Sequence, residues 1–242
     1  MAKERLDVLL VQRGLCASRE KAQRLIMAGA VFSGGTRMEK ASQTLAGDTP
    51  LEVREADRYV GRGGHKLEGA LRHFAIDPTG LTCLDVGAST GGFTDCLLQH
   101  GAAKVYALDV GHGQLDWKIR SDPRVAVMEH CNARHLQAAE FPEKVDLIVA
   151  DVSFISLTLV LPPVAEVLTD GGMIVALIKP QFELSRSEVG SGGIVRDDAA
   201  RARAVDKIRD FAASLGWTWG GVVDSPIAGT DGNREFLCLL KP

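Results

Sequence analysis

Residues 81–101 have the sequence LTCLDVGASTGGFTDCLLQHG. An apolar run ends at Asp85, glycines follow at positions 87, 91 and 92, and apolar residues with helical spacing continue to about residue 100. A strand, a glycine-containing loop and a helix in this order form the unit of doubly wound α/β sheets, which bind ligands at the carboxyl ends of their strands. Because glycine has no Cβ, we expect this loop to approach a nucleotide-like ligand closely. The spacing G-x-x-x-G-G departs from the dinucleotide fingerprint G-x-G-x-x-G, so no pyrophosphate cradle is predicted.

The same alternation of apolar runs and helical patterns continues from this segment to about residue 240. We expect strands at 82–86, 104–109, 124–128, 145–150 and 172–178 and near 218–224 and 235–240, and helices at 65–74, 92–100, 114–120, 158–168 and 198–214. This pattern predicts an α/β fold with a mainly parallel sheet covered on both faces. The turn-rich residues 225–233 (SPIAGTDGN) predict an antiparallel pairing of the last two strands.

The first 60 residues are predicted to form a separate, small α+β domain. Two short helices at 5–13 and 18–28 precede short strands at 30–33 and 49–53. The net charge of −3 hides an asymmetry, because residues 1–66 carry 12 lysines and arginines against 8 acidic residues and the remainder carries 16 against 23. The candidate RNA contacts are basic: Arg5, Arg13, Arg19, Lys21, Arg24 and Arg62. A solvated charged surface is the alternative interpretation of these residues.

Residues 54–64 (READRYVGRGG) have charges, three glycines and no apolar periodicity. We interpret them as a linker between a domain at 1–60 and a second domain at 65–242.

Polar residues at the strand ends are candidates for binding a cofactor. Asp109 follows the second strand of the larger domain, where its carboxylate could accept hydrogen bonds from ribose hydroxyls. Asn132 follows the third strand and would either meet an adenine or complete a turn. The remaining candidates lie in the opening segment: Asp85, Gly87, Ser89, Thr90, Gly91, Gly92 and Phe93.

Four charged residues occupy positions where an unpaired charge would be costly in free energy. Asp151 and Lys179 end two apolar strands, Lys66 opens the helix before the glycine loop, and Glu235 lies beside the last strand. The ends of neighbouring parallel strands meet in one crevice, so Asp151 and Lys179 are expected to face each other. Taken singly, Lys66 and Glu235 could simply mark where an element reaches the surface.

The sequence resembles two known groups of proteins. Residues 5–35 (RLDVLLVQRGLCASREKAQRLIMAGAVFSGG) resemble the RNA-binding module named after ribosomal protein S-four. The motifs GRGGHKL, LDVGASTGGFTD, ADVSFISL, LIKPQFE and GNREF resemble the FtsJ-type ribose 2′-O-methyltransferases, and the whole chain is similar to the TlyA family. The resemblance implies a Rossmann-like class I methyltransferase sheet, S-adenosyl-L-methionine as cofactor, and a catalytic tetrad formed by Lys66, Asp151, Lys179 and Glu235.

The family activity implied by this resemblance is methylation of a cytidine 2′-hydroxyl of 23S rRNA and, in some members, of 16S rRNA. Ribosomal RNA or ribosomal subunits would be the partner, and no metal is needed for methyl transfer. Lys179 is the expected general base. An ordinary lysine is protonated at neutral pH, so burial or a second cation, for which Lys66 is the candidate, would have to favour its neutral form.

Other features leave alternatives open. Phe154 and Phe182 could stack on an RNA base or belong to the core, and residues 185–198 could order over RNA or form a plain connection. The five cysteines have no zinc-binding spacing and are expected to be reduced thiols. No apolar stretch is long enough to span a membrane, so a cytoplasmic protein is expected. The rival functions are a nicotinamide-dependent dehydrogenase, a membrane-active haemolysin and a non-catalytic RNA-binding protein.

Overall fold

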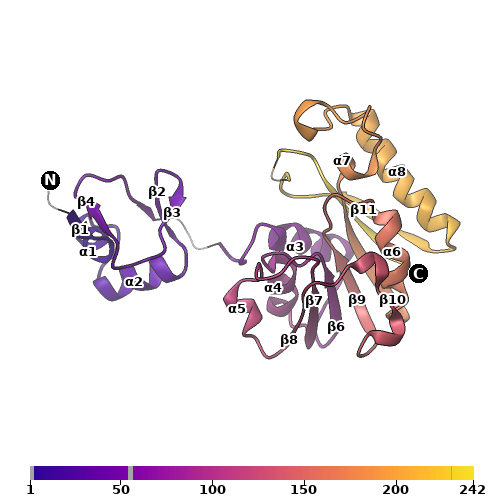
Figure 1. The fold of residues 1–242 in the computed structure, drawn as a ribbon, viewed down its shortest axis with the longest axis horizontal. Coiled ribbons are helices and arrows are strands. Elements are labelled where there is room, and N and C mark those ends of the chain that lie inside the picture. The colour runs from indigo at the N-terminus through magenta and orange to yellow at the C-terminus, as the bar shows by residue number, and fades with distance from the viewer. Residues whose placement is uncertain (1–2, 54–56, 230) are drawn as a thin grey trace. The chain divides into compact units, whose positions relative to one another are not determined.

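The chain forms two compact units that divide between Arg58 and Tyr59 (Figure 1). The computed structural model describes residues 3–53, 57–229 and 231–242. Part of the linker expected at 54–64, residues 54–56, lies outside the described residues. From Tyr59 onward the chain packs with the C-terminal unit, since the Tyr59 ring is buried in its core.

The N-terminal unit is a small α+β domain. Its elements are β1 (Lys3–Arg5), α1 (Leu6–Gln12), α2 (Arg19–Met27), β2 (Val31–Ser33), β3 (Thr36–Arg37), β4 (Thr44–Ala46) and β5 (Glu52–Val53). Strand β1 pairs with β4, and a second sheet has the order β3-β2-β5. Leu6 and Leu10 of α1 pack on Ala22 and Ile26 of α2 in one apolar cluster. Helix α2 begins as the sequence predicts, because the Ser18 hydroxyl accepts a hydrogen bond from the Lys21 N–H at 3.2 Å.

The C-terminal unit is built on a seven-stranded sheet of order β11-β12-β10-β9-β6-β7-β8. The strands are β6 (Thr82–Val86), β7 (Lys104–Leu108), β8 (Val125–Met128), β9 (Val145–Ala150), β10 (Leu168–Ile178), β11 (Thr218–Asp224) and β12 (Phe236–Lys241). The five strands from β6 to β10 pair in parallel, whereas β12 is antiparallel to both β10 and β11. The predicted mainly parallel sheet with an antiparallel last strand is therefore confirmed. Its register places the ends of β6, β7, β9 and β10 and the start of β12 at one edge.

Helices cover both faces of this sheet (Figure 1). The helices are α3 (Gly63–Phe74), α4 (Gly92–Gln99), α5 (Trp117–Arg120), α6 (Leu157–Ala165), α7 (Pro180–Glu183) and α8 (Asp198–Ser214), with 3-10 turns at Ala133–His135, Ala138–Glu140 and Ser191–Gly193. Apolar residues of α3, α4 and α5 pack on one face, and those of α6 and α8 pack on the other. The central strands β6, β7 and β9 are buried and mainly apolar on both faces, as expected for a sheet enclosed between two helical layers.

Two helix bounds and one additional helix show why the structure departs from the sequence-based expectation. Helix α3 begins at Gly63 and not at His65, because the glycines of the supposed linker pack against the glycine loop, as described below. Helix α6 ends at Ala165, since Leu168 already pairs with Val145 as the first residue of β10. The four-residue helix α7 was not predicted, because Pro180 directly after Lys179 gives only a local turn signal.

Candidate active site

The four charged residues singled out in the sequence line one cavity of about 220 Å³ at the carboxyl edge of the sheet. We call it the charged cavity. Lys66 comes from the first turn of α3, Asp151 follows β9, Lys179 follows β10, and Glu235 precedes β12. Residues 87–90 of the glycine loop and residues 92 and 93 at the start of α4 also line this cavity. Residues that are up to 169 positions apart in the chain thus meet around one space.

The charges of the cavity are arranged as two ion pairs. Lys66 Nζ lies 2.6 Å from Glu235 Oε2, and both side chains are buried. Lys179 Nζ lies 2.5 Å from Asp151 Oδ1 and donates a hydrogen bond to Ser153 Oγ at 2.9 Å. Each lysine therefore has its own carboxylate partner. Lys66, the candidate second cation near Lys179, has its charge compensated by Glu235. The sequence alone does not reveal this pairing.

A second cavity of about 400 Å³ adjoins the charged cavity and shares Gly87, Ser89, Asp151 and Ser153 with it. Its lining is largely apolar, with Val86, Leu108, Val152, Ile155 and Val160. We call it the apolar cavity. An apolar slot with a few polar groups at its rim is the usual form of a nucleoside-binding pocket.

Asp109 and Asn132 supply polar groups to the apolar cavity. The Asp109 carboxylate accepts hydrogen bonds from the N–H groups of Ser89 at 2.8 Å and Gly111 at 2.7 Å. These bonds fix the carboxylate and leave lone pairs for further donors. Asn132 caps the turn that follows, because its Oδ1 accepts from the Arg134 N–H at 3.1 Å. The two interpretations of Asn132 are thus compatible, since it completes a turn and also lines the cavity.

The glycines of the loop serve backbone geometry and close packing. Gly87 has φ +86°, and a Cβ there would lie 2.5 Å from the main-chain oxygen of Asp151. A Cβ on Gly91 would lie 2.8 Å from the Leu115 side chain, and Gly91 lines neither cavity. A Cβ on Gly92 would lie 3.0 Å from the main-chain oxygen of Gly61. The close approach that these glycines permit is mostly to the protein itself.

Residues 61–64 are glycine-rich for the same reason. A Cβ on Gly61 would lie 2.6 Å from Thr90 Oγ1, and one on Gly64 would lie 2.2 Å from the Tyr59 ring. The segment that we interpreted as a linker is therefore packed on the glycine loop, and it leads directly into the helix that carries Lys66.

Asp85 lies in the core and lines neither cavity. Its Oδ2 accepts a hydrogen bond from Thr94 Oγ1 at 2.6 Å, whereas its buried Oδ1 has no hydrogen-bond partner. Burial raises the pKa of Asp85 to about 7, against the opposing effect of the Thr94 hydrogen bond.

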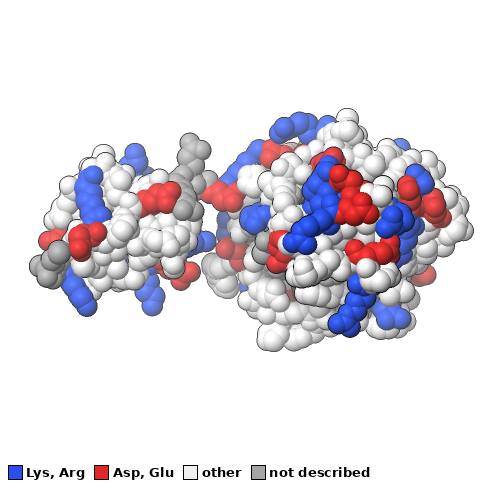
Figure 2. All heavy atoms as spheres, turned by 90° about the horizontal axis from the view of Figure 1, so that it is seen from above, with Lys and Arg blue, Asp and Glu red and all other residues white. Residues whose placement is uncertain are grey.

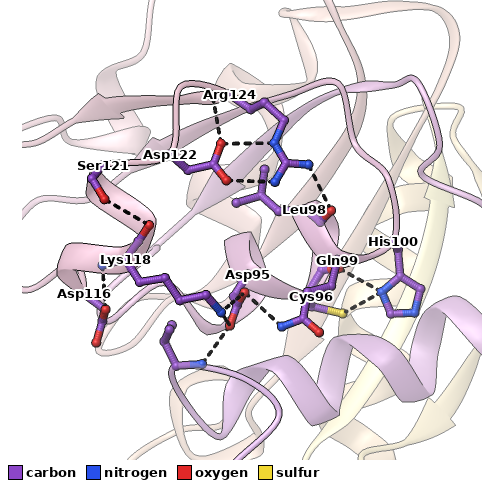
Figure 3. Close-up of polar contacts among 11 residues, drawn as sticks. Asp95, Cys96, Leu98, Gln99, His100, Asp116, Lys118, Ser121, Asp122 and Arg124 are labelled. Carbon is purple, nitrogen blue, oxygen red and sulfur yellow. Dashed lines mark hydrogen bonds and ion pairs between the residues drawn. The ribbon is translucent and has the colours of Figure 1, made fainter. Parts of the chain in front are cut away.

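Asp95 is a buried carboxylate that the sequence analysis missed (Figure 3). Its oxygens accept from the Val60 N–H at 2.9 Å, from Gln99 Nε2 at 3.0 Å and from Lys118 Nζ at 3.1 Å. One side chain of α4 thus holds the segment before α3 and the helix α5. An acidic residue at an inward-facing position of an apolar helix was the signal that could have revealed it.

The basic residues of the N-terminal unit have two kinds of environment. Arg5 and Arg19 donate to the fully buried carboxylate of Asp7 at 3.0 and 2.8 Å, and these bonds, that of Arg5 first, hold the pKa of Asp7 well below its usual range. Arg13 donates to the main-chain oxygens of Gly47 and Thr49. Lys21 and Arg24 are exposed on α2. The first three arginines therefore also stabilise the domain, which the sequence did not indicate.

Arg62 belongs to the C-terminal unit, where it lines the charged cavity and donates to the Ala228 oxygen at 2.6 Å. Elsewhere on this unit, Figure 2 shows basic and acidic side chains interspersed over the face that it presents.

The sequence model of the FtsJ-like methyltransferases matches residues 59–241, which include both cavities. The chain belongs to the FtsJ-like methyltransferase family. The model of the S4 domain matches residues 4–49 of the N-terminal unit, so the predicted RNA-binding module is confirmed.

A relative from Mycobacterium tuberculosis places the chain within the TlyA group of FtsJ-like methyltransferases. The chain is 48% identical over 241 residues to the 16S/23S rRNA (cytidine-2'-O)-methyltransferase TlyA of Mycobacterium tuberculosis, covering 99% of this chain and 90% of that protein. It is also similar to a solved structure described as a haemolysin from Streptococcus thermophilus, with 45% identity, a TM-score of 0.76 and coverage of 100% and 89% of the two chains. An S-adenosylmethionine-dependent methyltransferase from Mesorhizobium loti, 16% identical with a TM-score of 0.56 over 75% of this chain and all of that one, shares the fold.

Two further features are absent from the described residues. None of the helices in residues 3–53, 57–229 and 231–242 combines the length and apolar character of a membrane span. The same residues contain no group of three or more His, Cys, Asp and Glu side chains arranged to hold a metal ion.

Proposed function

We propose that this FtsJ-like methyltransferase methylates the 2′-hydroxyl of a cytidine in ribosomal RNA, in 23S rRNA and as a second target in 16S rRNA, with S-adenosyl-L-methionine as cofactor. The observation that carries the proposal is the position of the Lys179–Asp151 ion pair, which lines the charged cavity and whose Asp151 also lines the adjoining apolar cavity. The names of the relatives give the substrate class. A substrate of this kind would place the protein in the cytoplasm.

The apolar cavity fits the adenosyl group of the cofactor. Its apolar lining suits an adenine, and the Asp109 carboxylate is positioned at the end of β7 to accept hydrogen bonds from ribose hydroxyls. Ser89, Thr90, Gly92 and Phe93 would border the rest of the cofactor, because they line the adjoining charged cavity. When bound, S-adenosyl-L-methionine supplies a methyl carbon attached to a good leaving group.

Each member of the tetrad has a role that its contacts support. Lys179 in its neutral form accepts the proton that the 2′-hydroxyl loses, and Asp151 stabilises the resulting ammonium at 2.5 Å. Lys66 and Glu235 form hydrogen bonds to the ribose and so orient it. Their own ion pair is buried, which fixes both side chains before the substrate binds. Arg62 at the rim of the charged cavity is placed to contact a phosphate of the same nucleotide.

A third cavity of about 400 Å³ is available for the base of the target nucleotide. It shares Ser153, Lys179 and Glu235 with the charged cavity. The Phe154 and Phe182 rings line it with their centroids 5.1 Å apart. Phe154 is 90% exposed, which favours the interpretation that it stacks on an unpaired base over the alternative that it belongs to the core.

The test is transfer of labelled methyl groups from S-adenosyl-L-methionine to ribosomal RNA and to isolated subunits, followed by mass mapping of the product. We expect Lys179→Ala to abolish turnover and to change cofactor affinity less than about threefold, since Lys179 is proposed to act on the ribose. Lys104→Ala, which removes a lysine at the opposite edge of the sheet, is the matched control and should retain full activity. A methyl group on the base would refute the 2′-O assignment. Leakage of liposomes together with an absence of methyl transfer would favour the haemolysin alternative.

A further inference from the structure

The Glu183 carboxylate is buried although it does not line the charged cavity. Glu183 ends α7, four residues after Lys179, and its side chain is 1% exposed. A buried carboxylate is costly unless it is hydrogen-bonded or paired with a cation. Its partners therefore indicate what the residue does.

Three groups from two other helices satisfy this carboxylate. Oε1 accepts from the Leu157 N–H at 2.8 Å, and Oε2 accepts from Ser156 Oγ at 2.5 Å. Oε2 also pairs with Lys207 Nζ at 3.0 Å, and the same ammonium donates to the Glu183 main-chain oxygen at 2.7 Å. We call Glu183, Ser156, Leu157 and Lys207 the Glu183 cluster. It joins the end of α7 to the start of α6 and to the middle of α8.

The cluster closes a ring of contacts around the proposed general base. Residues 151–157 run from Asp151 to the start of α6, and residues 179–183 run from Lys179 to Glu183. At one end these two segments are joined by the Lys179–Asp151 pair and by the bond from Lys179 to Ser153. At the other end they are joined by the bonds of Glu183 to Ser156 and Leu157. Movement at the Glu183 end would therefore change the position of Lys179 relative to Asp151.

The backbone conformation within residues 151–157 is an independent indication that surrounding contacts fix this segment. Phe154 has φ +64°, a left-handed conformation that is strained for a bulky residue. Such strain persists only where the surrounding contacts determine the conformation. Phe154 lies between Ser153, bonded to Lys179, and Ser156, bonded to Glu183.

We infer that Glu183 is a positioning residue of the methyl-transfer site, which keeps Lys179, Asp151 and Phe154 in their working geometry by tying the segment after β10 to the segment after β9. This inference rests on the proposed function. Glu183 acts through Lys179 and the 151–157 segment and makes no contact with the reacting atoms.

The test compares Glu183→Gln with the wild-type full-length chain. Glutamine keeps the size and one acceptor but removes the charge that holds Lys207, and it places an N–H₂ group where one carboxylate oxygen accepted. We expect kcat to fall on the order of 10- to 100-fold, because small displacements of reacting groups have effects of this size. The dissociation constant for S-adenosyl-L-methionine, measured by calorimetry, should stay within about threefold.

Two readouts separate positioning from a general loss of stability. The pH dependence of kcat should shift, because the environment of the Lys179–Asp151 pair changes, and hydrogen exchange should increase in residues 151–157. Asp146→Asn is the matched control: Asp146 Oδ2 accepts from the Thr82 N–H at 3.0 Å at the opposite end of the sheet. This variant should lose stability but keep the wild-type pH profile. Lys207→Met, which leaves both bonds to α6, should have a smaller effect on kcat than Glu183→Gln.

The outcomes distinguish the inference from the function on which it rests. An inactive wild-type chain would contradict the proposed function. An active wild-type chain together with Glu183→Gln that keeps its kcat, pH profile and exchange rates would overturn the role of Glu183. If Glu183→Gln does not fold, Ser156→Ala removes only one of the two ties to α6. Its kcat should then fall with a shifted pH profile, and an unchanged kcat would overturn the inference.

Discussion

The Lys66–Glu235 ion pair allows a quantitative test of how the site is held together. Its two side chains are 9% and 3% exposed, and their charged atoms are 2.6 Å apart. Removing one partner of a buried pair leaves an uncompensated charge and costs about 3–5 kcal/mol, whereas replacing both partners costs much less. We therefore expect Lys66→Met and Glu235→Gln each to destabilise the C-terminal unit by about 3–5 kcal/mol, and the double variant to recover most of that loss.

The three tryptophans of the chain, Trp117, Trp217 and Trp219, all lie in the C-terminal unit, so urea unfolding followed by fluorescence reports on that unit. At a urea dependence of about 3 kcal/mol per molar, each single variant should lower the midpoint by about 1 to 2 M. Methyl transfer should be lost in all three variants, since the proposed ribose contacts are gone. Additive losses in the double variant, or single losses under about 1 kcal/mol, would show that the pair is not coupled as its geometry indicates.

Three further predictions concern other parts of the chain. The pKa of Asp85 is raised to about 7 by burial. The folded protein therefore binds more protons than the unfolded chain between about pH 4 and 7, and its stability falls as the pH rises through that window. The free energy of unfolding of Asp85→Asn, relative to that of the wild type, should therefore rise by roughly 3 kcal/mol between pH 5 and pH 8, as measured by urea unfolding. A difference between the two proteins that does not depend on pH would contradict the raised pKa. Lys21→Ala and Arg24→Ala should each lower the slope of log affinity for ribosomal RNA against log salt by about 1, and an unchanged slope would exclude phosphate contacts there. A fragment of residues 59–242 should still bind S-adenosyl-L-methionine in calorimetry but capture RNA weakly, whereas loss of cofactor binding would show that the units are not separable.

The sequence predicts the central strands of the sheet well because they are apolar runs. The bounds of β6 and β9 agree with the expectation, since burial on both faces gives an unambiguous apolar run, and the bounds of β11 and α8 agree as well. Strands β1, β3 and β4 contain only two or three residues each, which is too short for an apolar period to appear.

The sequence identifies the four charged residues of the charged cavity but does not predict how they pair. Strand order places the ends of β9 and β10 side by side, so the proximity of Asp151 and Lys179 follows from topology alone. The partnership of Lys66 with Glu235 depends on the packing of α3 against β12 and has no local signal. The glycines at positions 61, 63 and 64 belong to the segment that is predicted as a linker, because the sequence does not show which other segment they approach.

The order in which the elements occur along the chain has a consequence for biosynthesis. Strand β12 follows the other six strands of the sheet in the chain, yet it lies between β10 and β11 and directly follows Glu235. During translation, domains fold from the N-terminus as the polypeptide emerges. The S4 domain can therefore form early, whereas a nascent chain that lacks β12 has an open gap in its sheet and an unpaired Lys66. Such a chain would already display its RNA-binding surface while unable to modify any ribosomal RNA that it meets.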